Sequence, residues 1–279
     1  MIIDFHTHIF SADVCRNREP FLADGQFQSI YGMAGATLID HRDLANFMLR
    51  SGIDRAVAMG FPWEREDFCA AQNEYFRTVA ESSGGSIIPF ASVPVNRTAR
   101  IDAWVREIKD MGFRGVGEVS YYRNGMNSES IEHLRSLLSA ARSYSLPVCL
   151  HVNEPVGHRY PGKYDPLLQE VHAAVAENPD VVVILSHWGG GLLFYELMPE
   201  VSRSLKNCYY DTAATPLLYA DEIYGIAYRI TGSKKILFGT DYPLLSADRY
   251  IDAIKKSIPD EESLGDILGM NAVRLLKIT

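Results

Sequence analysis

Cysteine is scarce in this sequence, and the few cysteines present are not arranged as pairs. The four of them, Cys15, Cys69, Cys149 and Cys208, form no C-x-x-C motif and no zinc-finger spacing. Neither a disulfide framework nor a cysteine-based zinc site is therefore expected. Cys149 and Cys208 lie inside apolar runs, which favours buried free thiols.

The sequence also lacks a long apolar stretch and an excess of basic residues. No segment approaches the roughly 20 apolar residues that a membrane-spanning helix needs. The first residues, MIIDFH, show neither the basic nor the apolar part of a secretion signal. The net charge of −8 argues against nucleic acid or an anionic membrane as partner. We therefore expect a cytoplasmic protein whose partner is neither nucleic acid nor a membrane.

No internal repeat, low-complexity tract or flexible linker divides the 279 residues. Nothing in the composition marks a domain boundary, and a chain of this length can form one large domain. The sequence thus predicts a single domain over residues 1–279.

Short apolar runs recur along the whole chain. They are continuous rather than alternating with polar residues, as in parallel strands that are buried on both faces. Eight such runs are Met1–Phe5, Arg55–Phe61, Ser86–Val93, Arg114–Val119, Pro147–Val152, Val181–Ser186, Asn207–Asp211 and Lys235–Gly239.

Helical patterns fill the intervals between these runs. From Ser128 to Ser145, apolar residues recur three and four positions apart, which predicts an amphipathic helix capped by Ser128. The segment YDPLLQEVHAAVAENPD predicts another helix, capped by Asp165 with Pro166 in its first turn.

Eight buried strands separated by helices indicate an α/β fold, a (β/α)8 TIM barrel. The rival is a doubly wound open sheet, which should carry a glycine-rich turn after its first strand. Here that turn reads HTHIF instead. The segment Ile9–Ile39 is then a long first βα loop, and loops of this length often cover an active site.

Metal-binding and proton-transferring residues stand where the predicted strands end. His6 and His8 are two positions apart on an extended strand, so both rings project to the same side. The other candidates are Glu118, His151, His187 and Asp241. In a barrel all of them emerge around one mouth. A single histidine at a strand end is usually structural, and so we interpret His41, His133 and His172, which fall in helical patterns.

This pattern resembles the amidohydrolase superfamily, and it is most similar to the amidohydrolase 2 branch. That branch holds TIM-barrel metal-dependent hydrolases and decarboxylases of the aminocarboxymuconate semialdehyde type. The resemblance runs from the H-x-H of DFHTH to GTDYP. It implies that His6, His8 and His151 are metal ligands. It also implies that Asp241 is both a ligand and the general base, and that His187 is a catalytic group or a second-metal ligand.

The chemistry of a bound divalent ion fits these implied roles. Such an ion lowers the pKa of a bound water from 15.7 to roughly 7. Asp241 could accept the proton of that water, and His187 could polarise a substrate carbonyl. The resemblance implies one or two ions, with Zn²⁺ suiting the mixed nitrogen and oxygen donors best and Mn²⁺, Fe²⁺ or cobalt as substitutes.

Glu118 leaves the number of ions open. Many two-metal relatives use a carboxylated lysine from the fourth strand, and no lysine stands in RGVGEVSYY. A glutamate there resembles the TatD-like branch, in which it bridges two metals. The alternative is an inward-facing Glu118 that only forms hydrogen bonds.

The segment after His151, HVNEPVGHRYPGKY, is a turn-rich loop that could select the substrate. We expect His158, Arg159, Tyr160 and Lys163 to contact the substrate, with Arg159 and Lys163 suited to a carboxylate or phosphate. Aromatic residues are dense in the loops of the same face, and they either form an apolar pocket or fill the rim. They are Phe10, Phe61, Trp63, Tyr121, Tyr122, Trp188 and Tyr242.

The leading hypothesis is a metal-dependent hydrolase that cleaves a C–N or C–O bond (amide, lactone or ester) in a small molecule. The first alternative is a non-oxidative decarboxylase of a small unsaturated or aromatic carboxylic acid. The others are a TatD-like metal nuclease, which the acidic net charge disfavours, and a binding protein without metal. Fold alone fixes neither the substrate nor the assembly, although a homodimer is the commonest arrangement.

Overall fold

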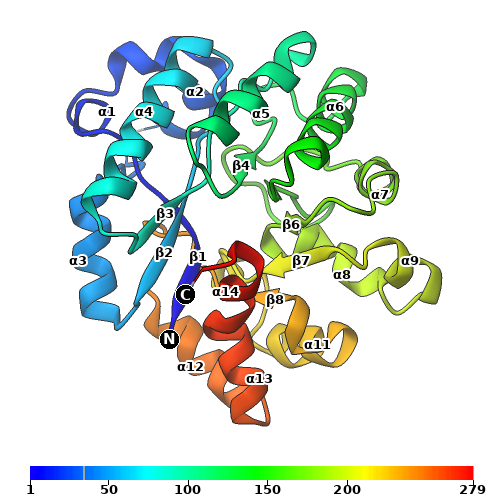
Figure 1. Cartoon of the computed structure of the whole chain (residues 1–279). Helices are drawn as coiled ribbons and strands as arrows, with labels where there is room; N and C mark the ends of the chain where they lie inside the picture. Colours follow the sequence, from blue (N-terminus) through cyan, green and yellow to red (C-terminus); the bar gives the residue numbers. More distant parts are fainter. Residues whose placement is uncertain (34, 279) are drawn as a thin grey trace.

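The computed structural model describes residues 1–33 and 35–278. Eight parallel strands form a ring that is surrounded by helices (Figure 1). The strands are β1 (Ile3–His8), β2 (Arg55–Met59), β3 (Ile87–Pro89), β4 (Val116–Val119), β5 (Val148–Leu150), β6 (Val183–Leu185), β7 (Cys208–Asp211) and β8 (Ile236–Leu237). Each coincides with a predicted run, although β1 extends to His8 and most of the others are shorter than expected.

Backbone hydrogen bonds close the ring at two seams. Regular ladders join neighbouring strands from β1 through β3, and again from β4 through β8. Between β3 and β4, the Ala91 N–H donates to the carbonyl of Gly115 at 2.9 Å. Between β8 and β1, the Phe5 N–H donates to the carbonyl of Phe238 at 2.7 Å. The predicted (β/α)8 barrel is therefore confirmed.

The residues inside the barrel form a core of their own, separate from the layer between strands and helices. Val57, Met59 and Ile184 belong to this inner cluster, while neighbouring residues such as Ala58 and Leu185 pack outward. Both faces of each strand are thus buried, which explains why the sequence shows continuous apolar runs. The buried thiols expected at Cys149 and Cys208 are confirmed.

The helices form an outer layer, and α14 differs from the rest by covering one end of the barrel (Figure 1). Ala272 and Leu276 of α14 join the inner cluster at the end where the strands begin. The site described below lies at the opposite end. The helices that follow β1 and its connection are α3 (His41–Ser51), α4 (Glu66–Ser82), α5 (Ile101–Asp110), α6 (Ser128–Tyr144), α7 (Leu168–Ala176), α8 (Leu192–Tyr195), α9 (Pro199–Ser204), α10 (Thr215–Leu218), α11 (Glu222–Thr231), α12 (Asp248–Ser257), α13 (Glu261–Gly265) and α14 (Asn271–Leu276).

Two predicted helix starts were wrong by one or two residues. The cap of α6 is Asn127 rather than Ser128, because the Asn127 side chain accepts hydrogen bonds from the backbone of Glu129 and Ser130. Asp165 does not cap α7. Its carboxylate instead accepts the Leu167 N–H within a turn, and Leu167 has a left-handed φ of 45° that delays the helix to Leu168.

The predicted long first βα connection is present, but much of it is helical. It contains α1 (Ala12–Arg16), a 3₁₀ turn (Glu19–Ala23) and α2 (Gly25–Tyr31). Buried Asp24 anchors the connection: Oδ1 accepts the N–H groups of Gln26 and Phe27, and Oδ2 accepts those of Glu64 and Arg65. One carboxylate therefore ties α2 to the loop that follows β2.

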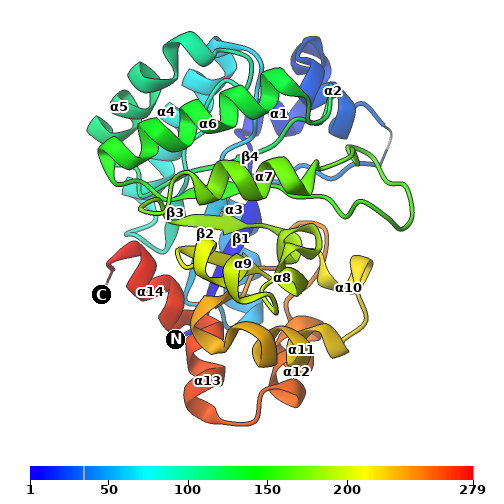
Figure 2. The ribbon, with the colours of Figure 1, turned by 90° about the vertical axis from the view of Figure 1, so that its right-hand side faces the viewer.

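Long connections gather at the end of the barrel opposite α14. Figure 2 shows α1, α2 and the β5–α7 loop (residues 151–167) extending beyond the strands on that side. Across residues 1–33 and 35–278, no helix combines the length and apolar character needed to cross a bilayer.

Candidate metal centre

A register shift in β1 brings two histidines to one point. The pairing of β1 with β2 slips between Asp4 and Thr7, as in a β-bulge. Phe5 remains in the inner core cluster, yet His6, the next residue, also turns inward. The Nε2 atoms of His6 and His8 consequently lie 3.1 Å apart. Bulges commonly re-aim side chains beside functional sites.

Asp241 approaches the same point from the turn after β8. Asp4 fixes that turn by accepting the hydroxyl of Thr240 at 2.6 Å and its N–H at 3.0 Å. The Asp241 N–H donates to the carbonyl of His6, and its left-handed φ of 64° directs the side chain inward. Its Oδ1 lies 3.0 Å from Nε2 of His8 and 3.8 Å from Nε2 of His6.

His187 begins an unusual left-handed turn after β6. His187 and Trp188 have φ values of 57° and 59°, and three glycines continue the positive-φ conformation. Such backbone strain in residues other than glycine tends to occur at functional sites. The ring is fixed because Nδ1 donates to the carbonyl of Ala213 at 3.0 Å. A carbonyl only accepts, so Nδ1 carries a proton, and Nε2 is the ring nitrogen that faces Glu118 in the barrel mouth.

Glu118 connects the side chains from opposite sides of the mouth. Its Oε1 lies 3.0 Å from Nδ1 of His151, 3.4 Å from Nε2 of His187 and 3.7 Å from Nε2 of His6. Its Oε2 accepts the Tyr122 hydroxyl at 3.2 Å. The side chain is only 2% exposed, and so it is enclosed by these partners.

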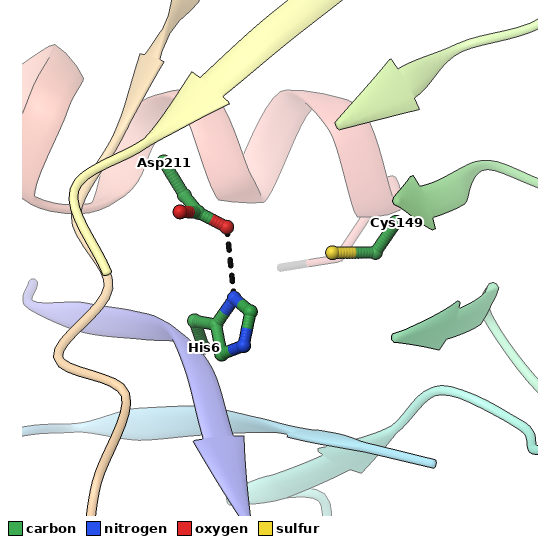
Figure 3. Close-up of side chains that lie close together, drawn as sticks. All are labelled: His6, Cys149 and Asp211. Carbon is green, nitrogen blue, oxygen red and sulfur yellow. Dashed lines mark hydrogen bonds and ion pairs between the residues drawn. The ribbon is translucent and has the colours of Figure 1, made fainter. Parts of the chain in front are cut away.

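A functional residue that the sequence analysis missed is Asp211, at the end of β7. Its Oδ2 accepts Nδ1–H of His6 at 2.8 Å, as Figure 3 shows, while Cys149 lies nearby on β5. This bond directs Nε2 of His6 toward the mouth, the usual arrangement for a metal-binding histidine. The signal was available, because Asp211 is a carboxylate at the end of a predicted strand.

The charges of these groups stabilise one another. Burial alone would lower the pKa of His187, but the hydrogen bond with Glu118 and the charge of Asp241 raise it to about 9. Burial alone would raise the pKa of Asp241, but the hydrogen bond with His8 and the charge of His6 lower it to about 2. The pKa of His6 is likewise raised against burial, chiefly by Asp211 and Glu118. The centre thus favours bound positive charge.

The donor set fits a divalent metal ion. Ligand atoms of His6, His8 and Asp241 lie within 4.8 Å of one another, and those of Glu118, His151 and His187 form a second such group. Imidazole nitrogens and carboxylate oxygens suit zinc, manganese and iron. The structure therefore brings together the six side chains that the sequence analysis placed at strand ends.

His151 differs from the other histidines in its hydrogen bonds. The Asn153 side chain donates from Nδ2 to Nε2 of His151 at 2.8 Å, and Asn153 is held in this orientation because its Oδ1 accepts the Tyr164 N–H. In this arrangement Nδ1 of His151 carries the ring proton and donates to Glu118. An ion bound at Nδ1 would have to displace that proton.

The predicted substrate-binding residues lie at different depths in the β5–α7 loop. His158 and Arg159 are exposed. Tyr160 is partly buried, and its hydroxyl accepts a hydrogen bond from Asn153. Lys163 lies beside Glu154, with 3.8 Å between Nζ and Oε2. Tyr160 is therefore linked to His151 through Asn153, whereas His158 and Arg159 face solvent.

Aromatic residues form a wall on one side of the centre. The Tyr122 ring meets the His151 ring edge to face, with centroids 5.2 Å apart, and Phe61 stacks near Tyr122 at 6.1 Å. Tyr31 from α2 packs on Phe61 at 5.8 Å. Phe61 is itself buried behind Tyr122, and the remaining expected rim aromatics also lie in the core. They are Phe10, Trp63, Tyr121 and Trp188, which are buried, and Tyr242, which stacks on Phe47.

Known structures share this barrel over nearly the whole chain. One is 5-carboxyvanillate decarboxylase from Sphingomonas paucimobilis (12% identity, TM-score 0.75, 100% of this chain and 99% of that chain). Another is dihydroxybenzoic acid decarboxylase from Polaromonas sp. JS666 with bound manganese and 2-nitroresorcinol (16%, 0.69, 99% and 96%). A third is an amidohydrolase from Burkholderia multivorans with bound HEPES (14%, 0.68, 100% and 100%).

One of two sequence comparisons identifies the family. A search of curated protein sequences gave no match. The family model described as amidohydrolase matches residues 3–278. The resemblance read from the H-x-H and GTDYP motifs is thereby confirmed, and the chain belongs to the amidohydrolase family.

Proposed function

We propose that this protein is a metal-dependent decarboxylase of a small aromatic or similarly unsaturated carboxylic acid. The observation that carries the proposal is the convergence of His6, His8 and Asp241 on one point, next to the aromatic wall of Phe61 and Tyr122. Oxygen and nitrogen donors bind a divalent ion, and an aromatic wall accommodates a planar substrate. Hydrolysis, the leading hypothesis from the sequence, becomes the second candidate.

The structural neighbours support this order. Two of those described above are decarboxylases of substituted benzoic acids by name, and one of them holds manganese with a nitroresorcinol inhibitor. We extend both features to this chain as part of the proposal. Manganese accordingly takes precedence over zinc as the metal to test first.

Each residue of the centre has its own role in the proposed decarboxylation. A bound divalent ion would hold and polarise the oxygens of the substrate. Tyr122, which packs against His151, orients the ring, and buried Phe61 supports Tyr122. His187, whose raised pKa keeps the ring protonated at neutral pH, delivers its Nε2 proton to the ring carbon that bears the carboxylate. That carbon gains a C–H bond as its bond to the carboxylate carbon breaks, and carbon dioxide leaves. Asp241, which is ionised because its pKa is lowered to about 2, accepts the proton of a neighbouring substrate hydroxyl.

Hydrolysis remains the second candidate because of Glu118. Its Oε1 lies between His6 on one side and His151 and His187 on the other. A carboxylate in that place can bridge two ions, and paired ions suit hydrolysis because they activate water and polarise the bond to be cleaved. A TatD-like nuclease would share this feature, but the chain is acidic overall.

A product assay separates these functions. The manganese-loaded protein is incubated with hydroxybenzoates that carry ¹³C in the carboxyl group, and separately with aryl amides, esters and lactones in H₂¹⁸O. The proposal predicts labelled carbon dioxide from at least one acid and no ¹⁸O uptake from the second set. Turnover of an amide, ester or lactone with ¹⁸O in the product, and none of the acids, would instead establish a hydrolase.

A further inference from the structure

The β5–α7 loop contains a buried carboxylate whose two oxygens have different surroundings. Glu154 is only 8% exposed. Its Oε2 accepts the hydroxyl of Tyr160 at 3.0 Å and lies 3.8 Å from Nζ of Lys163. Its Oε1 is buried and has no hydrogen-bond partner among the described residues. Buried polar atoms are rarely left unpaired, so Oε1 calls for a partner from outside the chain.

Neither Tyr160 nor Lys163 donates a hydrogen bond to Oε1 of Glu154. The Tyr160 hydroxyl accepts from Asn153 and donates to Oε2. Lys163 donates to the carbonyl of Val156 at 2.6 Å. The capacity that remains at Oε1 is that of an acceptor only, because an ionised carboxylate has no proton to donate. The missing partner must therefore be a hydrogen-bond donor.

Glu154 is connected to the candidate metal centre by a short chain of hydrogen bonds. His151 is linked to Asn153 at 2.8 Å, Asn153 to Tyr160 at 2.9 Å, and Tyr160 to Glu154 at 3.0 Å. The same loop closes onto the aromatic side of the mouth, where Gly162 leaves no room for a side chain against Ile30 and Tyr122. The loop that carries Glu154 thus borders the aromatic side of the mouth.

We propose that Oε1 of Glu154 recognises a hydroxyl or amino group that the substrate carries away from its reacting carboxylate. The inference rests on the proposed function and narrows its substrate class to acids with such a second donor. A site built to accept a substrate hydrogen bond rejects an analogue that lacks the donor, since the buried acceptor is then left unpaired.

Binding to the manganese-loaded protein tests this inference. The probes are 2-hydroxybenzoates that carry either a hydroxyl or a fluorine at ring position 3, 4, 5 or 6, because fluorine is similar in size but cannot donate. Isothermal titration calorimetry gives the dissociation constants. At one position, the hydroxyl compound should bind at least about tenfold more tightly than its fluoro counterpart. Glu154→Gln should abolish most of that preference.

Two variants separate recognition from changes in charge or loop structure. Asp165→Asn removes one negative charge from the same loop, where the carboxylate only accepts the Leu167 N–H. Tyr160→Phe removes the hydrogen bond that Oε2 of Glu154 accepts but leaves Oε1 in place. Both should retain the preference for the hydroxyl compound. Metal content and circular dichroism spectra show that each variant is folded and loaded.

The outcomes distinguish the inference from the function on which it rests. If the acids bind but hydroxyl and fluorine are equivalent at every position, or if Glu154→Gln keeps the preference, Glu154 is not the recognition point and the inference fails alone. Loss of the preference in Tyr160→Phe as well would assign Glu154 a role in loop structure only. If no acid binds to the loaded protein, the proposed function and the inference fail together.

Discussion

Asp211 accepts the Nδ1–H of His6 at 2.8 Å, and this contact decides which nitrogen of His6 faces the mouth of the barrel. Both side chains are fully buried. The other oxygen of Asp211 accepts the N–H groups of His187 and Ala213. One carboxylate on β7 therefore positions a side chain from β1 and the start of the strained turn after β6.

Replacing this carboxylate should weaken metal binding without removing a ligand. In Asp211→Asn, the amide can still accept from the His187 backbone but holds His6 less firmly and leaves its Nε2 less basic. We expect the affinity for Mn²⁺ to fall by about 10- to 100-fold. Competition with a fluorescent chelator measures the affinity.

Asp54→Asn is the matched control for this prediction. Asp54 also accepts a backbone N–H, that of Ile2, but it does so where the strands begin, at the other end of the barrel. Its replacement should leave Mn²⁺ binding unchanged. Equal affinities for the Asp211→Asn protein and the unmodified protein would show that Asp211 does not orient a metal ligand.

The anchor of the first connection gives a prediction about stability. Both oxygens of Asp24 accept backbone N–H groups, two each, so Asp24→Asn forces an amide NH₂ against two donors. We expect the free energy of unfolding to fall by about 1–3 kcal/mol. Urea denaturation measures it. Asp165→Asn is the control, because Asp165 accepts a single backbone N–H that an amide oxygen can also accept. It should change the free energy of unfolding by less than about 0.5 kcal/mol.

The sequence predicted the barrel well because apolar runs and the residues that end them are local features of the sequence. Continuous apolar runs identify strands that are buried on two faces, and parallel strands bring their ends together whatever the loops do. His6, Glu118, His151, His187 and Asp241 could therefore be placed around one mouth before their contacts were known.

What the sequence could not supply depends on contacts between distant residues. Asp211 and His6 are 205 positions apart, and only the closed barrel shows that they touch. The bulge that turns His6 inward depends on how β1 pairs with β2 and with Tyr242 in the turn after β8. Asp165 has the sequence signature of a helix cap, yet a left-handed Leu167 moves the helix start to Leu168.

A buried histidine away from the centre predicts how stability changes with pH. His133 on α6 donates from Nε2 to the carbonyl of Pro94 and accepts the Tyr121 hydroxyl at Nδ1. Burial lowers its pKa to about 4, from an ordinary value near 6.5. Between these values the unfolded chain binds the proton and the folded protein does not, so stability is complete above pH 6.5 and falls as the pH drops.

This loss should reach about 3 kcal/mol by pH 4. Urea denaturation at pH 7, 6 and 5 measures the free energy of unfolding. In His133→Gln the part of the pH dependence due to this ring disappears, although the variant is less stable at pH 7. An unchanged slope of stability against pH in His133→Gln would show that the ring binds its proton equally well in the folded and unfolded states.

The number of ions depends on Glu118. If its carboxylate bridges two sites, Glu118→Gln should lower bound manganese from about two equivalents to about one, because an amide oxygen is a poorer bridging ligand. If it only forms hydrogen bonds, the metal content should stay the same. Elemental analysis of the unmodified and Glu118→Gln proteins after dialysis distinguishes the two arrangements. A bridging Glu118 would favour hydrolysis over decarboxylation.

The central claim is that His6, His8 and Asp241 hold a metal ion, and it is tested most directly by counting metals per chain. The protein is purified without chelator or metal-affinity tag, and bound metals are determined by plasma mass spectrometry. The account predicts at least a near-stoichiometric divalent transition metal that is lost in His6→Ala and in Asp241→Asn. A folded protein that binds no metal, even after incubation with Mn²⁺ or Zn²⁺, would contradict it.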